Sequence, residues 1–214
     1  SNSADGSVTI SVNYTNGTNP QVFYVGANGL ENMNATYDNN KNTLTWTTSH
    51  FSDYVVLDDS TVATITSSTG VKAFKSLQAA VDAANTGDVV RLEKNVVLDG
   101  NGKGNNQGLL QIDNNKTLTI DGNGHTISAK NVTATKVNEN NYSGPSMINI
   151  QDNANVTVKN LVIDGGAATE KTTATKHGLN VYQAAVTVDN VTIKNGNGYA
   201  IVANGSTATV NGLT

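Results

Sequence analysis

Short phrases that alternate apolar and polar residues recur along the second half of the chain. Four of them end almost identically, as LTI at 118–120, VTV at 156–158, VTV at 186–188 and ATV at 208–210. Each follows another alternating triplet by five or six residues: LQI at 110–112, INI at 148–150, LNV at 179–181 and IVA at 201–203. Strands that recur in a fixed order without helices between them are typical of a parallel β-helix, in which each turn buries its apolar side against the next. The pattern therefore predicts an all-β solenoid with two such strands in every turn.

The two-residue period of a strand assigns the faces of these phrases. We expect the aliphatic residues to point inward: Leu118, Ile120, Val156, Val158, Val186, Val188, Ala208 and Val210. The threonines between them should form an outward column of Thr119, Thr157, Thr187 and Thr209. Two places past the last aliphatic residue stand Gly122, Asn160, Asn190 and Gly212. Glycine and asparagine accept positive φ, so these positions predict sharp corners, where the asparagines can also stack amide on amide.

The repeats are unevenly spaced. Their phrases lie 38, 30 and 22 residues apart, whereas one bare turn of such a solenoid needs about 20 to 25 residues. The surplus falls at 128–145 and 167–176, each time after the third strand of a turn. We therefore expect two inserts on the same side of the solenoid, and loops held by a rigid scaffold are where binding residues concentrate.

The N-terminal part has a different pattern. Alternating strands are predicted at 8–14, 21–26, 43–48 and 54–57, separated by turn-rich segments. Fifty residues make a marginal core, so this small β-module should pack on its neighbour or lack a strand. Its expected core is Phe23, Trp46, Phe51 and Tyr54.

A strand at 62–66 precedes the one predicted α-helix. Ser76 is suited to be its N-cap, and Gly87 follows its end. Its apolar stripe consists of Leu77, Ala80, Val81 and Ala84. Because the first turn of a solenoid has an open end, we expect this helix to cap it, with the solenoid beginning at 88–98.

Composition narrows the functional classes. The chain has 214 residues, a net charge of −4, no cysteine and only 14% charged residues. A mildly acidic chain argues against nucleic acid as a partner. The chain contains no apolar run of 18 residues, so we predict no membrane insertion in this segment. A polarity based on Asn, Thr, Ser and Gly is common in extracellular bacterial β-proteins.

Two stretches carry a family resemblance. AFKSLQAAVDAANTGDVVRLEKNVVL at 73–98, followed by LLQIDNNKTLTIDGNGHTI at 109–127, resembles the start of right-handed β-helix domains of the pectin-lyase-like superfamily in surface proteins of Gram-positive bacteria. NATYDNNKNTLTWTTSHFSDYVVLDD at 34–59 resembles a small all-β module of the same proteins. The resemblance implies the fold and a cell-surface location. It leaves the activity open, since the superfamily includes lyases, hydrolases, phage tailspikes and non-catalytic adhesins.

A lyase of this superfamily combines acidic calcium ligands with an arginine base. Arg91 is the only arginine of the chain, and its neighbourhood in sequence has no carboxylate cluster. We interpret it as a solvent-facing cation beside Glu93. The phrase DGNGKGNN at 99–106 is similar to a calcium loop, but Lys103 and Leu110 occupy ligand positions of an EF-hand. We predict no metal and no cofactor, although a calcium site made of backbone carbonyls stays open.

A hydrolase of this fold needs carboxylates about 5 to 10 Å apart, on either side of the scissile bond. The acids Asp113, Asp121, Asp152, Asp164 and Asp189 fall mostly in turns, where they accept backbone N–H bonds. His177-Gly178 is similar to the His-Gly of polygalacturonases, but the accompanying motifs are missing. His50 and His125 are interpreted as structural. No catalytic residue is predicted.

Glycan recognition needs planar polar groups and an aromatic platform. The inserts supply Asn140, Asn141, Tyr142, Lys171 and Lys176, which we predict as ligand-binding residues. Tyr142 is expected to be the most exposed tyrosine of the solenoid, ahead of Tyr182 and Tyr199. The alternative that the inserts are mobile loops without a ligand stays open.

Together these patterns predict three segments: a small all-β module at 1–58, a strand and capping helix at 59–87, and a parallel β-helix at 88–214 that is truncated at its C-terminus. We predict a non-catalytic adhesin, stalk or glycan-binding fragment at a bacterial cell surface or wall. Its partners would be a host or environmental glycan or a surface protein, with self-association through the last turn at 199–214. The alternative is a polysaccharide lyase or glycoside hydrolase whose active site lies largely beyond residue 214.

Overall fold

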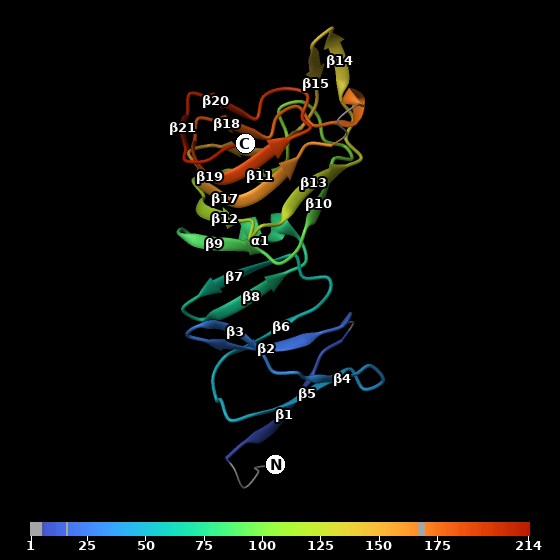
Figure 1. Ribbon diagram of the computed structural model, residues 1–214, viewed down its shortest axis with the longest axis vertical. Coiled ribbons are helices and arrows are strands. Elements are labelled where there is room, and N and C mark those ends of the chain that lie inside the picture. Colours follow the sequence, from blue (N-terminus) through green and yellow to red (C-terminus); the bar gives the residue numbers. More distant parts are fainter. Residues whose placement is uncertain (1–5, 16, 167–169) are drawn as a thin grey trace.

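The chain is elongated, with its strands stacked across the long axis (Figure 1). The computed structural model describes residues 6–15, 17–166 and 170–214. They form mostly β-structure, with one α-helix, α1 (Leu77–Ala83), and a short 3₁₀ turn, η1 (Lys171–Thr173), in the described ranges. No helix within those ranges is long and apolar enough to span a membrane.

The N-terminal part contains two small antiparallel sheets in the described chain. One has the order β1 (Val8–Asn13), β5 (Thr43–Thr48), β4 (Thr36–Asp38), and the other β3 (Gly29–Asn32), β2 (Gln21–Gly26), β6 (Tyr54–Leu57). The four expected strands are present, and β3 and β4 are additions to them. Val22, Leu44 and Trp46 are buried and form a core shared by both sheets.

The expected core of this part was partly wrong. Trp46 is buried and Tyr54 packs against the core, but Phe23 is only half-buried and outside this core, and Phe51 is 76% exposed. The exposure of Phe51 is explained by the loop between β5 and β6, where the Tyr54 hydroxyl donates to the His50 backbone carbonyl at 2.8 Å and lies 2.8 Å from Thr48 Oγ1. These contacts hold the loop so that the His50 ring stacks on Tyr24 at 4.3 Å, and Phe51 remains outside.

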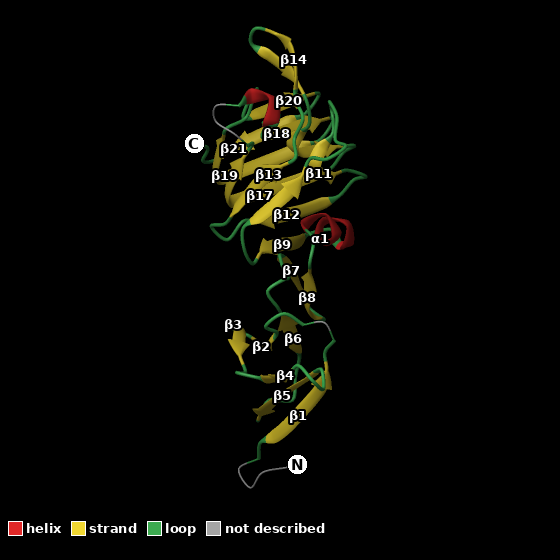
Figure 2. Cartoon of the chain, turned by 90° about the vertical axis from the view of Figure 1, so that its right-hand side faces the viewer, coloured by secondary structure: helices red, strands yellow, loops and turns green. Residues whose placement is uncertain are grey.

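The segment before the parallel strands forms a hairpin and the helix. β7 (Ala63–Ser67) pairs antiparallel with β8 (Gly70–Phe74), a strand that the sequence pattern did not indicate, and with β9 (Asp88–Leu92). Helix α1 begins as expected, since the Ser76 hydroxyl accepts a bond from the Ala79 N–H. Its buried residues Leu77, Ala80 and Val81 belong to the core of the following strands. Figure 2 shows α1 at the side of the stack, between β8 and β11.

A large sheet contains the parallel strands of the second half. It joins β9 to β12 (Thr117–Asp121), β17 (Asn155–Asp164), β19 (Ala185–Lys194) and β21 (Thr207–Val210). The second half of β17 also pairs with β13 (Thr126–Lys130), which in turn pairs with β10 (Val96–Asp99). The register confirms the expected stacking, because Val156 lies between Leu118 and Val186. The threonine column is confirmed as well: Thr119, Thr157, Thr187 and Thr209 are successive partners.

A second parallel sheet, the β11–β20 sheet, consists of β11 (Gly108–Ile112), β16 (Ser146–Gln151), β18 (Leu179–Tyr182) and β20 (Ile201–Asn204). Its inward residues include Leu110, Ile148 and Leu179, which are fully buried. They share one core with the inward residues of the large sheet. On the last strand of the large sheet, Ala208 and Val210 are exposed rather than buried, since no further strand covers β21 in the described chain.

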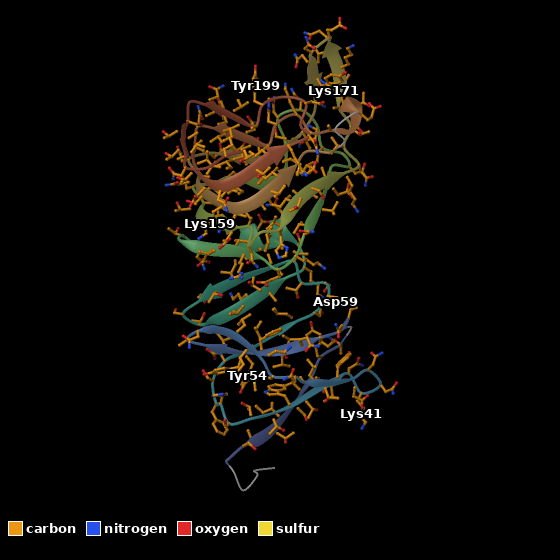
Figure 3. All side chains as sticks on the ribbon, viewed as in Figure 1. Lys41, Tyr54, Asp59, Lys159, Lys171 and Tyr199 are labelled. Carbon is orange, nitrogen blue, oxygen red and sulfur yellow. The ribbon has the colours of Figure 1, made fainter. Side chains whose placement is uncertain are left out.

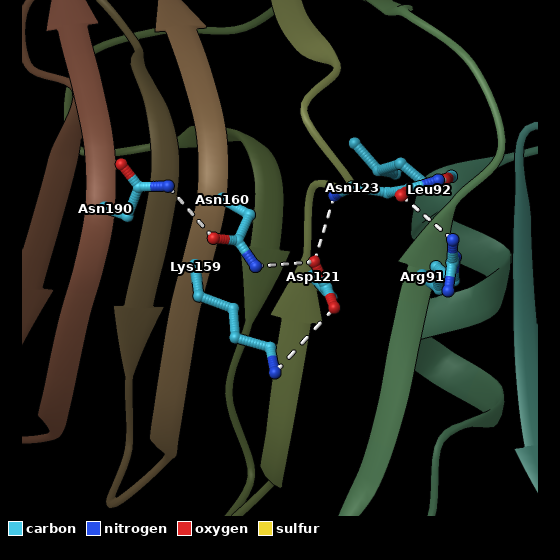
Figure 4. Close-up of polar contacts among 7 residues, drawn as sticks. All are labelled: Arg91, Leu92, Asp121, Asn123, Lys159, Asn160 and Asn190. Atoms are coloured by element: carbon cyan, nitrogen blue, oxygen red, sulfur yellow. Dashed lines mark hydrogen bonds and ion pairs between the residues drawn. The ribbon is translucent and has the colours of Figure 1, made fainter.

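Both long strands bend at an asparagine. Asn160 in β17 and Asn190 in β19 have φ of 51° and 52°, and their amides stack as expected, with Asn190 donating to Asn160 at 3.0 Å (Figure 4). Gly122 differs from the expectation, because the positive φ angles at this corner belong to Asn123 and Gly124. Gly122 is required for space instead: a Cβ there would lie 2.4 Å from the Asn160 carbonyl oxygen.

The two inserts lie on one side, as expected. The first forms a hairpin of β14 (Thr135–Asn138) and β15 (Asn141–Ser143), which projects past the end of the stack in both views (Figures 1 and 2). The described part of the second contains η1. The Ala134 N–H donates to the Thr172 carbonyl at 2.8 Å, so the inserts contact each other. Residues 167–169 of the second insert lie outside the described ranges.

Candidate functional site

The outer face of the β11–β20 sheet carries two rows of polar side chains. Strand alternation turns every second residue outward, and the register sets Gln111, Asn149, Asn180 and Val202 side by side. The next row is Gln151, Tyr182 and Asn204. Apart from Gln111, the residues of both rows line a depression of about 490 Å³, together with Asn106 and His177.

A network of amide groups holds the floor of this depression. Asn149 is only 2% exposed, and its Nδ2 donates to the Asn106 carbonyl at 3.1 Å and to Gln151 Oε1 at 3.2 Å. Asn180 Nδ2 donates to Asn149 Oδ1 at 2.6 Å. Buried amides that are satisfied in this way have one orientation, so the floor presents a fixed arrangement of donors and acceptors.

A second depression of about 550 Å³ adjoins the first and shares His177 and Val202 with it. Four of the predicted residues line it: Asn140, Asn141, Tyr142 and Lys176. The fifth, Lys171, lies with its Nζ 6.0 Å from the centre of the Tyr142 ring. The structure thus brings all five together, although their role in binding stays a prediction.

The most exposed tyrosines are not the expected one. Tyr142 is half-buried, whereas Tyr182 is 45% and Tyr199 is 72% exposed. The pairing of β14 with β15 and the position of Lys171 over the ring account for the reduced exposure of Tyr142. Figure 3 labels Lys171 and Tyr199 at the same end of the molecule. The alternation in LNVY, which puts Tyr182 in phase with Asn180, is the sequence signal that could have shown Tyr182 to face outward.

His177 stands where the two depressions meet. Its Nδ1 accepts a hydrogen bond from the Tyr199 N–H at 3.0 Å, and its ring stacks on the Tyr199 ring with centroids 5.9 Å apart. Burial, together with the positive charge of Lys176, lowers the pKa of His177. The ring is therefore neutral near pH 7, and because Nδ1 accepts, the proton is on Nε2.

The charges at this site are cationic in the described residues. Neither depression is lined by a carboxylate, and Lys176 is their one lysine. The aspartates considered for hydrolysis do not converge there: Asp121 pairs with Lys159 and Asp164 with Lys194 on the large sheet. The described chain also holds no group of three or more side chains suited to a metal ion.

Arg91 lies on the large sheet, away from the β11–β20 sheet. Its Nη2 donates to Asn123 Oδ1 at 2.9 Å, and the Asn123 amide donates to the Leu92 carbonyl (Figure 4). Arg91 is exposed, as expected of a solvent-facing cation, while Glu93 accepts a bond from the Thr64 hydroxyl. In register, Arg91 lies opposite Asp121 of β12.

A family model described as "Putative pectate lyase-like adhesive domain" matches residues 68–201, which is more than half of the chain. The chain belongs to this family. The adhesive domain therefore runs from the β7–β8 turn to the first residue of β20 and includes α1 and both outward rows as far as β18. Comparison with curated proteins and with solved structures gave no match.

Membership of this adhesive-domain family indicates an adhesin-like role, the binding of surface partners and an extracellular or surface location. The expected relation to pectin-lyase-like surface domains is confirmed at this level. The matched range contains most of the residues that line both depressions.

Proposed function

We propose that this chain is a non-catalytic adhesive module of a bacterial cell surface that binds a glycan along the outer face of the β11–β20 sheet. The observation that carries the proposal is the row of fixed amides beside two exposed tyrosines. Amides donate and accept hydrogen bonds in one plane, as sugar hydroxyls require, and tyrosine rings offer flat apolar surface with a polar end. Depressions of about 300 to 1,000 Å³ are typical of small-ligand sites.

The scaffold that we propose for this site is a right-handed β-helix at 88–214, capped by the segment 59–87 and preceded by an all-β module at 1–58. Contacts of α1 support the cap. Gln78 donates to the Gln111 carbonyl and accepts from the Gln111 N–H, each at 2.9 Å, so its side chain pairs with the edge of β11 as a strand would. Lys116 Nζ donates to the carbonyls of Asp82 and Ala84 at the other end of the helix.

The arrangement of charges favours binding over turnover. General acid and base catalysis of glycoside cleavage needs two carboxylates about 5 to 10 Å apart across the bond. The described lining of both depressions has none, and the one arginine is on a different sheet. A lyase or hydrolase with its active site largely beyond residue 214 is the second candidate, and it rests on the family relation to pectate lyases.

The test is a glycan array probed with the chain and with Tyr182→Ala and Tyr199→Ala. Each change removes one exposed ring, which we expect to weaken binding about tenfold, or about 1.4 kcal/mol. Phe51→Ala is the matched control, because it removes an exposed ring far from the groove. Tyr142→Ala tests whether the first insert takes part in binding. An unchanged array signal would show that the β14–β15 hairpin does not contribute to the site.

The same samples separate the two candidates. Incubation with uronic-acid and neutral polysaccharides should yield neither unsaturated products nor new reducing ends. Turnover that one carboxylate substitution abolishes would establish an enzyme instead. An array on which no glycan binds would overturn the glycan-binding proposal.

A further inference from the structure

The side-chain amides at the floor of the first depression form a chain of hydrogen bonds that all run in the same direction. The backbone carbonyl of Asn106 accepts a hydrogen bond from Asn149 Nδ2, and Asn149 Oδ1 accepts one from Asn180 Nδ2. Each amide thus donates toward the N-terminal strands and directs its oxygen toward the C-terminal ones. The next position in register is Val202, which has no polar group to continue the chain.

The last acceptor of this chain is therefore open. Among the described residues, no donor reaches Asn180 Oδ1, and Asn180 is half-buried in the depression. Leaving an acceptor in such a place without a partner costs free energy unless water or a ligand supplies a donor. The apolar side chain of Val202 lies directly beside it, also facing the depression.

An open acceptor next to a methyl-bearing surface matches one common sugar substituent. An acetamido group carries an N–H donor, a carbonyl acceptor and a methyl group within a few ångströms. Its N–H can donate to Asn180 Oδ1 while its methyl packs on Val202. Asn204, two residues along the same strand, has an exposed amide that can donate to the acetamido carbonyl.

We infer that this depression selects glycans that carry an uncharged 2-acetamido sugar, and this inference rests on the proposed glycan-binding function. A polyuronate fits less well, since it carries a carboxylate on each ring and needs cations along the floor. The floor supplies amides, a phenol and an aliphatic side chain, and within the described chain its one titratable nitrogen is the neutral His177. The one lysine belongs to the adjoining depression.

Matched oligosaccharides test the inference. Isothermal titration would compare a β-1,4-linked N-acetylglucosamine trimer with cellotriose, which has the same backbone and hydroxyls in place of the acetamido groups, and with trigalacturonate. A glycan array would extend the comparison to N-acetylgalactosamine glycans and their 2-hydroxy counterparts. We expect the acetamido member of a pair to bind at least about tenfold more tightly, the effect of one good hydrogen bond.

Val202→Asn is the decisive variant, because its amide would continue the chain and donate to Asn180 Oδ1. It should reduce the preference for the acetamido member to less than about twofold, whereas Val202→Ile, which keeps the apolar surface, should retain it. Thermal melts of both variants verify folding. If the asparagine variant does not fold, the wild-type ratio alone decides.

The possible results separate the two levels of the proposal. Preference for acetamido glycans that disappears in Val202→Asn supports the inference. Equal or tighter binding of the 2-hydroxy or uronate partners overturns the inference and leaves the glycan-binding function standing. Absence of binding to every glycan overturns the function and the inference with it.

Discussion

The side-chain amide of Asn190 donates a 3.0 Å hydrogen bond to the amide oxygen of Asn160 on the neighbouring strand, and Asn160 in turn donates to Asp121 at 3.4 Å (Figure 4). At the third corner the sequence has Gly122, so Asp121 accepts the bond that an asparagine would otherwise receive. Lys159 lies 3.7 Å from the same carboxylate. Asp121 thus joins β12 to β17 at the bend, and Asn160 extends the network to β19.

This arrangement recurs in the stack. A Lys-Asn dipeptide lies over an aspartate of the preceding strand three times in the described chain: Lys130-Asn131 over Asp99, Lys159-Asn160 over Asp121, and Lys194-Asn195 over Asp164. In each case the lysine pairs with one carboxylate oxygen and the asparagine, at positive φ, donates to the other. The device satisfies a turn carboxylate and fixes the register of two strands together.

The corner amide should contribute measurably to stability. Asn160→Gly keeps the positive φ and loses the bonds to Asn190 and Asp121, which we expect to cost about 1 kcal/mol, while Asn160→Ala adds backbone strain for a total of about 2 to 3 kcal/mol. Urea unfolding measures both. Asn155→Ala on the same strand is the control, since that side chain is exposed and makes no hydrogen bond in the described chain. Equal costs for all three would contradict the role of the ladder.

Asp121 should contribute more to the stability of the fold than Asp189, its counterpart two strands along the stack. Asp121 accepts from the Asn123 N–H at 3.0 Å and from Asn160, and it pairs with Lys159. Asp189 has no side-chain bond or ion pair to any described residue. We expect Asp121→Ala to cost about 1 to 2 kcal/mol and Asp189→Ala less than about 0.5 kcal/mol. Chemical denaturation of the two variants under identical salt provides the comparison.

Gln78 is expected to protect the edge of β11. Gln78→Glu keeps the acceptor for the Gln111 N–H but removes the donor to the Gln111 carbonyl, at a cost of about 1 to 3 kcal/mol. Hydrogen exchange should show faster opening of β11. Asp82→Asn is the control, because it keeps an acceptor for Gln78 and removes only the charge. Unchanged protection of β11 in the glutamate variant would count against the capping role.

The N-terminal sheets should respond to Leu44 and not to Phe51. Leu44 is fully buried, so Leu44→Ala should cost about 2 to 5 kcal/mol. Phe51 is 76% exposed, so Phe51→Ser should change stability by less than about 0.5 kcal/mol. Thermal unfolding monitored by the fluorescence of Trp46 reports on this part of the chain. A large loss of stability in Phe51→Ser would indicate that Phe51 belongs to the core after all.

His177 should make the stability of the region between the two depressions depend on pH. Its pKa is lowered in the folded chain, so the neutral ring contributes stability above its ordinary pKa, and this contribution is lost as the pH falls through the lowered value. Protonation of Nδ1 also removes the acceptor for the Tyr199 N–H. NMR titration should show a depressed pKa that rises toward the ordinary range in Lys176→Met. A pKa that the substitution leaves unchanged would exclude the lysine as a cause.

The sequence could predict the stacked strands because a parallel stack repeats the same contacts in every turn. Leu118, Val156 and Val186 occupy equivalent places in alternating phrases, so one register explains all of them. The position of α1 followed from Ser76 and one apolar stripe. Strands without such a pattern were missed: β3 and β14 are exposed along their length, so burial leaves no alternation in their residues.

The candidate site was only half predictable. Residue type and the insert positions pointed to Tyr142 and Lys176, which do line the second depression. The first depression depends on Asn149 and Asn180, whose spacing of 31 residues becomes a side-chain contact only through the register of β16 and β18. The orientation of an amide depends on its whole hydrogen-bond network, so the sequence alone could not show that the Asn180 oxygen lacks a donor.

The direction of the hydrogen bonds in the stack has a mechanical consequence. The strands lie across the long axis, with β1 near one end of the described chain and β21 toward the other (Figure 1). Tension between these ends would pull along the inter-strand bonds and load them one after another rather than all at once. Such a module would lengthen by peeling off single strands at modest force, and a tether between a cell and its target would absorb sudden pulls by gradual extension.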